Sequence, residues 1–204
     1  MFLIYSLEPE TLNLTPFEIT SYHKDAAESL KKTKSTAPYG YIFSGQIALK
    51  DEKYEKAAIE FQQAKKQRGG KRIIKKNISG ILRAVQPELK KDEAPQSLID
   101  LVAVTLSAAK EPEVDKWIEH THYWIRWNAV SIKKRADLAV DTVKVYILDL
   151  KHGGSMRTRV RAARKLGEAG DKRAIEPLKE AKEKGIRDPF VSGTAATVLE
   201  KYFE

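Results

Sequence analysis

The chain has 204 residues, of which 42% are apolar, a net charge of +9 and no cysteine. This amount of apolar material is enough to bury a continuous core, and the lack of cysteine excludes disulfides, thiolate metal sites and cysteine nucleophiles. No apolar run reaches the roughly 20 residues that a membrane-spanning helix needs. The apolar start, Met1 to Leu7, lacks the basic flank and the cleavage site of a secretory signal. We therefore expect a soluble, cytoplasmic protein.

Positive charge is concentrated in two segments. Residues 65–91 carry +9 and residues 151–204 carry +5, whereas residues 1–64 carry −2 and residues 92–150 carry −3. Such clusters point to an anionic partner, which is nucleic acid, a lipid surface or an acidic protein face. The alternative is a solvated surface that serves only solubility.

Helix signals recur from about residue 15 to the end, and the alternating pattern of strands is nearly absent. The first helix start is a capping box at Thr15, Pro16 and Glu18. Breaks such as Gly69-Gly70, Pro87 and Gly153-Gly154 then separate segments of about 10 to 20 residues. The pattern predicts an all-α protein of about ten helices, stacked as antiparallel pairs in an α-solenoid.

The N-terminal region, residues 1–90, contains one repeat-like pattern. Its aromatic and small positions are Tyr41, Gly45, Tyr54, Ala57, Phe61 and Ala64. The pattern resembles a tetratricopeptide repeat, in which Gly45 permits close contact between two helices and Phe61 lies on the packing face of the second. One such unit cannot bury its own faces, so it must pack on flanking helices.

A basic amphipathic helix is predicted at residues 71–85 of the same region. Its apolar arc consists of Ile73, Ile74, Ile78, Ile81, Leu82 and Val85. The cations are Lys71, Arg72, Lys75, Lys76 and Arg83. Without interleaved aromatic residues, such a face can follow phosphates or hold an acidic protein but reads no bases. The alternative is a solvated outer face over a packed core.

Trp117, Trp124 and Trp127 fall within 11 residues, and a continuous helix would place the three indoles near one face. An aromatic stripe at helical spacing is usually core, and the alternative is a platform for peptides or bases. His120 and His122 point to different sides of such a helix, so we expect no metal site there.

The C-terminal region, residues 91–204, repeats with a period of 33. Ala129-Val130, Ala162-Ala163 and Ala195-Ala196 recur at this spacing. The run from Arg159 to Leu178 resembles the HEAT-like repeat found in phycobilisome lyases, and the resemblance extends over residues 122–204. In this run, Gly170 ends one helix and Asp171 caps the next.

A second group of cations lies in this repeat: Arg157, Arg161, Arg164 and Lys165. They fall opposite the apolar residues of their helix, and the resemblance implies that this helix lines the convex side of the repeat. Arg126 and Arg159 also recur at the spacing of 33, and we expect them to form ion pairs between repeats.

The sequence lacks the motifs of nucleotide-binding loops, serine hydrolases and zinc proteases. The segment from Trp124 to Val130 resembles a repeat helix of the HEAT-like DNA glycosylases, which need an aspartate beside tryptophans in a groove. For that role the chain offers Trp117-Ile-Glu119, with the carboxylate at a shifted position. We therefore predict neither an enzyme nor a cofactor or metal site.

These observations favour a noncatalytic protein-interaction scaffold or regulatory module, whose basic helix holds an acidic segment of a partner protein. The alternative is nonspecific nucleic-acid binding, with a DNA glycosylase as its enzymatic variant. The final helix carries apolar residues that no following repeat covers, namely Phe190, Val198, Leu199, Tyr202 and Phe203. We expect self-association through this helix.

Overall fold

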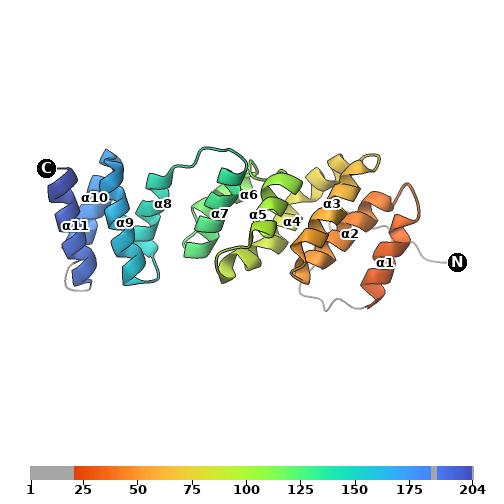
Figure 1. Ribbon diagram of the computed structural model, residues 1–204, viewed down its shortest axis with the longest axis horizontal. Coiled ribbons are helices and arrows are strands. Elements are labelled where there is room, and N and C mark those ends of the chain that lie inside the picture. The colour runs from red at the N-terminus through yellow and green to blue at the C-terminus, as the bar shows by residue number, and fades with distance from the viewer. Residues whose placement is uncertain (1–20, 185–187, 204) are drawn as a thin grey trace. The chain divides into compact units, whose positions relative to one another are not determined.

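The computed structural model describes residues 21–184 and 188–203. All regular structure in these two ranges is helical, with eleven α-helices, one π-helical segment and one 3-10 turn (Figure 1). The all-α prediction is therefore confirmed. The helix start predicted at Thr15, Pro16 and Glu18 lies outside the described residues. Within the described ranges, no helix is both long and apolar enough to cross a membrane.

The chain divides into two compact units, which we call unit 1 (Met1–Glu113) and unit 2 (Val114–Glu204). The predicted regions instead meet at residues 90 and 91. The difference arises because helix α5 (Gln96–Asp100) and the π-helical segment η2 (Leu101–Thr105) pack on helix α3 (Tyr54–Lys66). The segment after residue 91 thus shares its contacts with the N-terminal helices.

Unit 1 is built on four helices in which each packs on the next along the chain: α1 (Ser21–Lys31), α2 (Ala37–Lys50), α3 and α4 (Gly70–Lys91). The contact between α2 and α3 depends on Gly45, where an added Cβ would lie 3.0 Å from the Phe61 ring. Ala57, Phe61 and Ala64 are fully buried on α3. This is the packing that the tetratricopeptide-like pattern predicts.

Helix α4 begins at a tight turn and runs through a proline. At Gly70 a Cβ would lie 1.8 Å from the carbonyl oxygen of Ala64, so only glycine fits this position. The prediction of a break at Pro87 is wrong, because the helix continues to Lys91. An internal proline costs a helix about 3 kcal/mol. Burial of Leu89, in the turn after the proline, offsets this cost.

Unit 2 contains the helices of the HEAT-like region. They are α6 (Pro112–Ile118), which begins just before the unit, α7 (Tyr123–Arg135), α8 (Thr142–His152), α9 (Met156–Ala169), α10 (Ile175–Glu183) and α11 (Pro189–Tyr202). The core between α8 and α11 includes Ala163, Leu166, Leu178 and Val198. As predicted, Gly170 ends α9 in the left-handed region, with φ of 61°.

The turn after α9 is held by Asp171. Its carboxylate accepts a hydrogen bond from the backbone N–H of Arg173 and so caps the 3-10 turn η3 (Lys172–Ala174) that leads into α10. The Arg173 guanidinium also bonds Asp141, the N-cap of α8. The same guanidinium also donates to the Asp171 carboxylate at 2.7 Å, and its bonds to the two carboxylates lower the pKa of Asp171 and of Asp141 below the usual value.

Arg126 and Arg159 occupy equivalent places in their repeats. Arg126 donates from Nη1 to the carbonyl of His120 at 2.5 Å and forms an ion pair with Asp149. Arg159 donates from Nη1 to the carbonyl of Gly153 at 2.6 Å and forms an ion pair with Asp188. Each arginine therefore ties the turn before its own helix to a carboxylate of another element. Both arginines thus form ion pairs, but only that of Arg159 joins two repeats, because Asp149 lies on α8 of the same helix pair as Arg126 whereas Asp188 precedes α11.

Candidate binding surfaces

The outer side of α4 in unit 1 carries a cluster of exposed cations. We call it the α4 basic face and define it by Lys71, Arg72, Lys75, Lys76 and Arg83, all exposed. The opposite side of the helix buries Ile74, Ile78, Ile81, Leu82, Val85 and Leu89. The period of the apolar residues therefore fixes which side of α4 faces solvent.

No cation of the α4 basic face has a carboxylate partner among the described residues. The end of the same helix differs, since Lys91 pairs with Glu52 at 2.6 Å and with Glu88 at 2.7 Å. These bonds raise the pKa of Lys91 above its usual value. The five cations of the α4 basic face thus precede the end of the helix that Lys91 anchors.

The like charges of the α4 basic face stand close together along the helix. Lys71 and Lys75, and likewise Arg72 and Lys76, are four positions apart. Such like-charge neighbours destabilise a helix by roughly 0.2–0.5 kcal/mol per pair. An anionic ligand would relieve this repulsion, and its carboxylates or phosphates match both the Lys ammonium and the Arg guanidinium.

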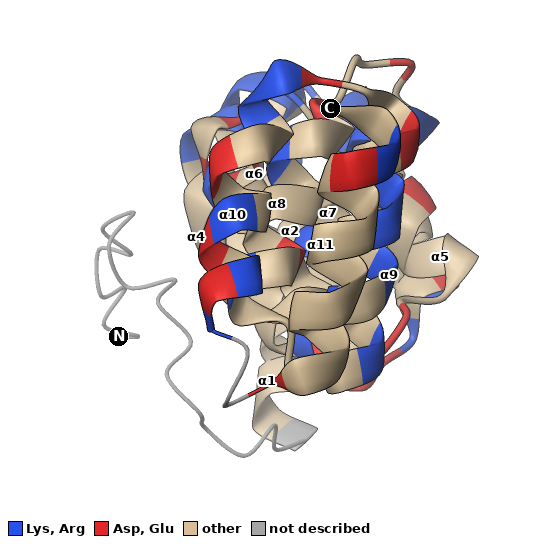
Figure 2. Ribbon diagram, turned by 90° about the vertical axis from the view of Figure 1, so that its left-hand side faces the viewer, with Lys and Arg blue, Asp and Glu red and all other residues tan. Residues whose placement is uncertain are grey.

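A second group of cations lies on α9 of unit 2, where Lys and Arg recur along the helix (Figure 2). Arg157, Arg161 and Arg164 are exposed and have no ion-pair partner among the described residues. Lys165 differs because its ammonium pairs with Glu168 at 2.6 Å, which raises the pKa of Lys165. Only three of the four predicted cations are therefore available to an anion.

The tryptophans do not form one platform. The continuous helix that a shared face would require is absent, because α6 ends at Ile118 and α7 begins at Tyr123. Trp117 is only 1% exposed and belongs to the core. Trp124 and Trp127 are partly buried on α7, and the Trp127 ring lies 5.3 Å from the ring of Tyr146 on α8.

Asp149 of α8 stands at the centre of this aromatic group. One of its carboxylate oxygens accepts from the Arg126 guanidinium, and the other accepts from the indole N–H of Trp127 at 2.7 Å. With 2% exposure and both oxygens engaged, Asp149 supports the fold and is not presented to a ligand. An aspartate beside a tryptophan thus exists here, but it lacks the access that base-excision chemistry requires.

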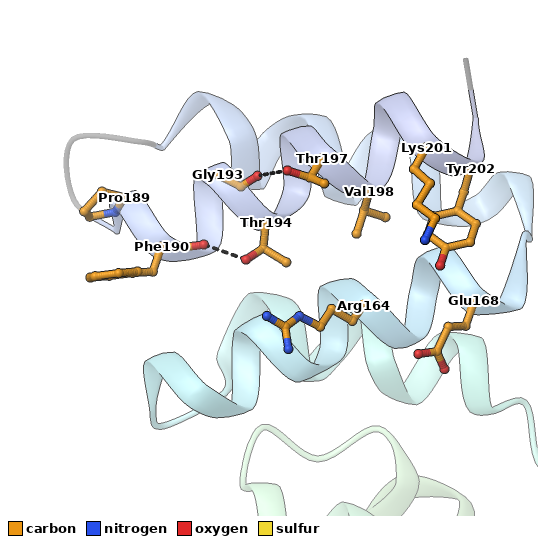
Figure 3. A pocket seen from close by; sticks show the side chains of 10 residues that line it. All are labelled: Arg164, Glu168, Pro189, Phe190, Gly193, Thr194, Thr197, Val198, Lys201 and Tyr202. Carbon is orange, nitrogen blue, oxygen red and sulfur yellow. Dashed lines mark hydrogen bonds between the residues drawn. The ribbon is translucent and has the colours of Figure 1, made fainter.

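A groove of about 520 Å³ lies between α9 and α11 and is lined by Arg164 and by residues of α11 (Figure 3). Its apolar wall includes Phe190 and Tyr202, which are 67% and 42% exposed. By contrast, Val198 and Leu199 are buried in the core of unit 2, so the expectation that they are uncovered is wrong. The reason is that α9 and α10 both pack on α11.

Sequence reasoning missed two of the residues that matter here. Lys201 lines the groove beside Tyr202. Its position in the groove could not be predicted without knowing which side of α11 is buried. Asp149 lies on the buried side of α8 near Val145 and Leu150, and a lone carboxylate in such a stripe is a signal for a buried ion pair. Among the described residues there is no group of His, Asp and Glu that could hold a metal ion.

The comparisons with known proteins identify the repeat. Residues 158–184, which cover most of α9 and all of α10, match the family model described as PBS lyase HEAT-like repeat. This match confirms the resemblance seen in the run from Arg159 to Leu178. Searches of curated proteins and of solved structures gave no match.

Proposed function

We propose that this HEAT-like helical repeat protein is a noncatalytic scaffold or regulatory module that holds an acidic segment of a partner protein on its α4 basic face. The observation that carries the proposal is a set of five exposed cations on one side of a helix whose other side is buried, none of which has a carboxylate partner among the described residues. Helical repeat proteins bind through the extended surfaces of their stacked helices, which supports a binding role.

The charges of the α4 basic face contribute nothing to the packing of unit 1. The buried side of α4 consists of aliphatic residues, and the anchored end is held by Lys91, Glu52 and Glu88. The remaining cations repel one another, so they weaken the isolated helix. A charged surface that costs stability and lacks a partner in the described part of the chain is best explained by an external partner.

An acidic protein segment fits this surface better than nucleic acid. Arg83 stands 12 positions after Lys71 on the helix, so the face is about 18 Å long at 1.5 Å per residue. No aromatic residue lies on it, so single-stranded bases have nothing to stack on. Carboxylates spaced along a peptide can meet these cations one by one, with Arg72 and Arg83 each able to bind in bidentate fashion.

The test is a titration of the full chain with a labelled glutamate peptide of about twelve residues, followed by fluorescence anisotropy. The binding variant combines Arg72→Gln, Lys75→Gln and Lys76→Gln. The matched control combines Lys134→Gln, Lys172→Gln and Lys182→Gln, three exposed lysines of unit 2 that have no ion-pair partner among the described residues. Both variants lose the same net charge.

We expect the binding variant to weaken peptide binding about tenfold, since three partners of roughly 0.5 kcal/mol each are lost. The control should change affinity less than about twofold. Equal losses in both variants would mean that only net charge matters and would refute the proposal. A DNA duplex that binds the α4 basic face more tightly than the peptide at physiological salt would replace it with nucleic-acid binding.

A further inference from the structure

The groove between α9 and α11 has one wall built from a single stripe of α11. Phe190, Thr194, Val198 and Tyr202 follow one another at intervals of four residues and face α9, with Phe190 and Tyr202 at the two ends (Figure 3). The stripe is about 18 Å long at 1.5 Å per residue. Arg164 lies opposite its middle (Figure 3). The groove is thus long enough for a short peptide segment.

The groove combines this apolar wall with two available cations. Arg164 and Lys201 have no carboxylate partner among the described residues, and Lys201 lies over the Tyr202 ring at 5.1 Å. Glu168 is the one lining carboxylate on the α9 side, and it pairs with Lys165. The charge left to a ligand in the groove is therefore positive.

The remaining polar groups of the wall are satisfied within α11. Thr194 Oγ1 donates to the carbonyl of Phe190 at 2.8 Å, and Thr197 Oγ1 donates to the carbonyl of Gly193 at 3.0 Å. Because both hydroxyls are hydrogen-bonded within the helix, a ligand that contacts these threonines leaves no hydroxyl without a partner. Gly193 adds open space, since nothing lies within 4 Å of a Cβ placed there.

We propose that the α9–α11 groove is a second peptide site, which takes an acidic segment carrying an aromatic or aliphatic anchor. The carboxylates of the segment bind Arg164 and Lys201, and its anchor packs against Phe190 and Tyr202, which are both exposed. The site belongs to unit 2 alone and does not depend on the α4 basic face.

Charge complementarity favours a foreign acidic segment over a second copy of this chain. In a twofold dimer the same patch faces itself, so Arg164 and Lys201 would face a patch that carries the same two cations. Like charges at such contacts are unfavourable. Nucleic acid fits less well, because two cations beside an apolar wall offer too few phosphate contacts.

The test first selects peptide ligands and then measures their affinities. A random library of peptides of about twelve residues is selected on the immobilised full chain, and the enriched peptides are titrated by fluorescence anisotropy. Two groove variants are used: the pair Arg164→Gln with Lys201→Gln, and Phe190→Ala alone. Their controls are Arg157→Gln, an exposed cation of α9 that does not line the groove, and Ile59→Ala, an exposed apolar residue of unit 1.

We expect one class of enriched peptides to be acidic with an aromatic or aliphatic residue and to bind each groove variant about tenfold more weakly. The controls and the α4 variant Arg72→Gln, Lys75→Gln, Lys76→Gln should change the affinity of these peptides by less than about twofold. If no enriched peptide loses affinity with a groove variant, the groove is not a peptide site. A dimer seen by sedimentation that Phe190→Ala dissociates would also overturn the proposal, because it assigns the groove to a second copy.

The function proposed for the α4 basic face is tested separately, with the glutamate peptide and the α4 variant. Failure of the glutamate peptide to respond to the α4 variant refutes the function proposed for unit 1 and leaves the groove result standing. If the enriched acidic peptides lose affinity with the α4 variant but not with the groove variants, they bind the α4 basic face and not the groove.

Discussion

The arginines of unit 2 and the cations of α4 in unit 1 show two uses of the same residue types. Arg126 is fully buried, bonds the carbonyls of His120 and Thr121, and pairs with Asp149. Arg72 and its neighbours on α4 are exposed and lack partners among the described residues. A cation surrounded by fixed acceptors serves the fold, whereas a row of cations without acceptors weakens its own helix. Mutations at the two places should therefore have effects of opposite sign.

The largest effect is expected for Arg126→Ala, which removes the buried cation of the Arg126–Asp149 ion pair. The change leaves the Asp149 carboxylate, 2% exposed, without its cation. Removing one partner of a buried pair costs about 3–5 kcal/mol. Urea unfolding followed by circular dichroism measures the loss. The double variant Arg126→Ala, Asp149→Ala should recover part of the lost stability. If Arg126→Ala alone were as stable as the unchanged chain, the ion pair would not be structural.

Arg159→Ala should have a smaller effect at the equivalent position one repeat later. Arg159 also forms an ion pair, with Asp188, and bonds the carbonyl of Gly153, but the two side chains are 29% and 20% exposed. Water can replace part of these contacts, so we expect a loss of about 1–3 kcal/mol. The same urea unfolding gives the value. A loss larger than that of Arg126→Ala would contradict burial as the factor that separates the two repeats.

The period of 33 predicts both arginines but neither of their partners. Asp149 stands 23 residues after Arg126, whereas Asp188 stands 29 residues after Arg159. A carboxylate can reach the guanidinium from different elements, so its position along the chain is not repeated. The turn at Gly170 and Asp171 was predictable because caps depend on residues adjacent in sequence.

The sides of helices were predictable only where the apolar pattern was complete. The α4 basic face follows directly from the buried aliphatic arc of its helix. A shared face for Trp117 and Trp124 could not be predicted from their spacing, because helix α6 ends between them. The groove beside Arg164 required knowing that α9 and α10 cover one side of α11 and leave Phe190 and Tyr202 exposed. Long-range packing of this kind is not encoded in local spacing.

Tyr54→Phe tests the anchored end of α4, and we expect a loss of about 1 kcal/mol at neutral pH. The Tyr54 hydroxyl donates to Glu88 at 3.1 Å. Burial and this bond raise the pKa of Tyr54 from 10.0 to about 12. The folded state therefore holds the proton more tightly, and its advantage declines as the pH rises from about 10, where the unfolded chain ionises, to about 12. The stability difference between the unchanged chain and the Phe variant should shrink across this range in urea unfolding. A constant difference would show that Tyr54 ionises alike in both states.

The smallest effect, and the one of opposite sign, is expected for the α4 variant Arg72→Gln, Lys75→Gln, Lys76→Gln. Glutamine has nearly the helix propensity of arginine and lysine, so the change mainly removes like-charge neighbours on an exposed surface. We expect stability to rise by about 0.5 kcal/mol at low salt, and the gain to shrink as salt screens the repulsion. Lys91→Gln, on the same helix, is the matched control, because it removes a cation that pairs with Glu52 and Glu88 and should lower stability slightly. Thermal unfolding at low and high salt separates the two cases. If the triple variant lost stability as Lys91→Gln does, the cations of the α4 basic face would have partners within the fold, and an external acidic partner would no longer be needed to explain them.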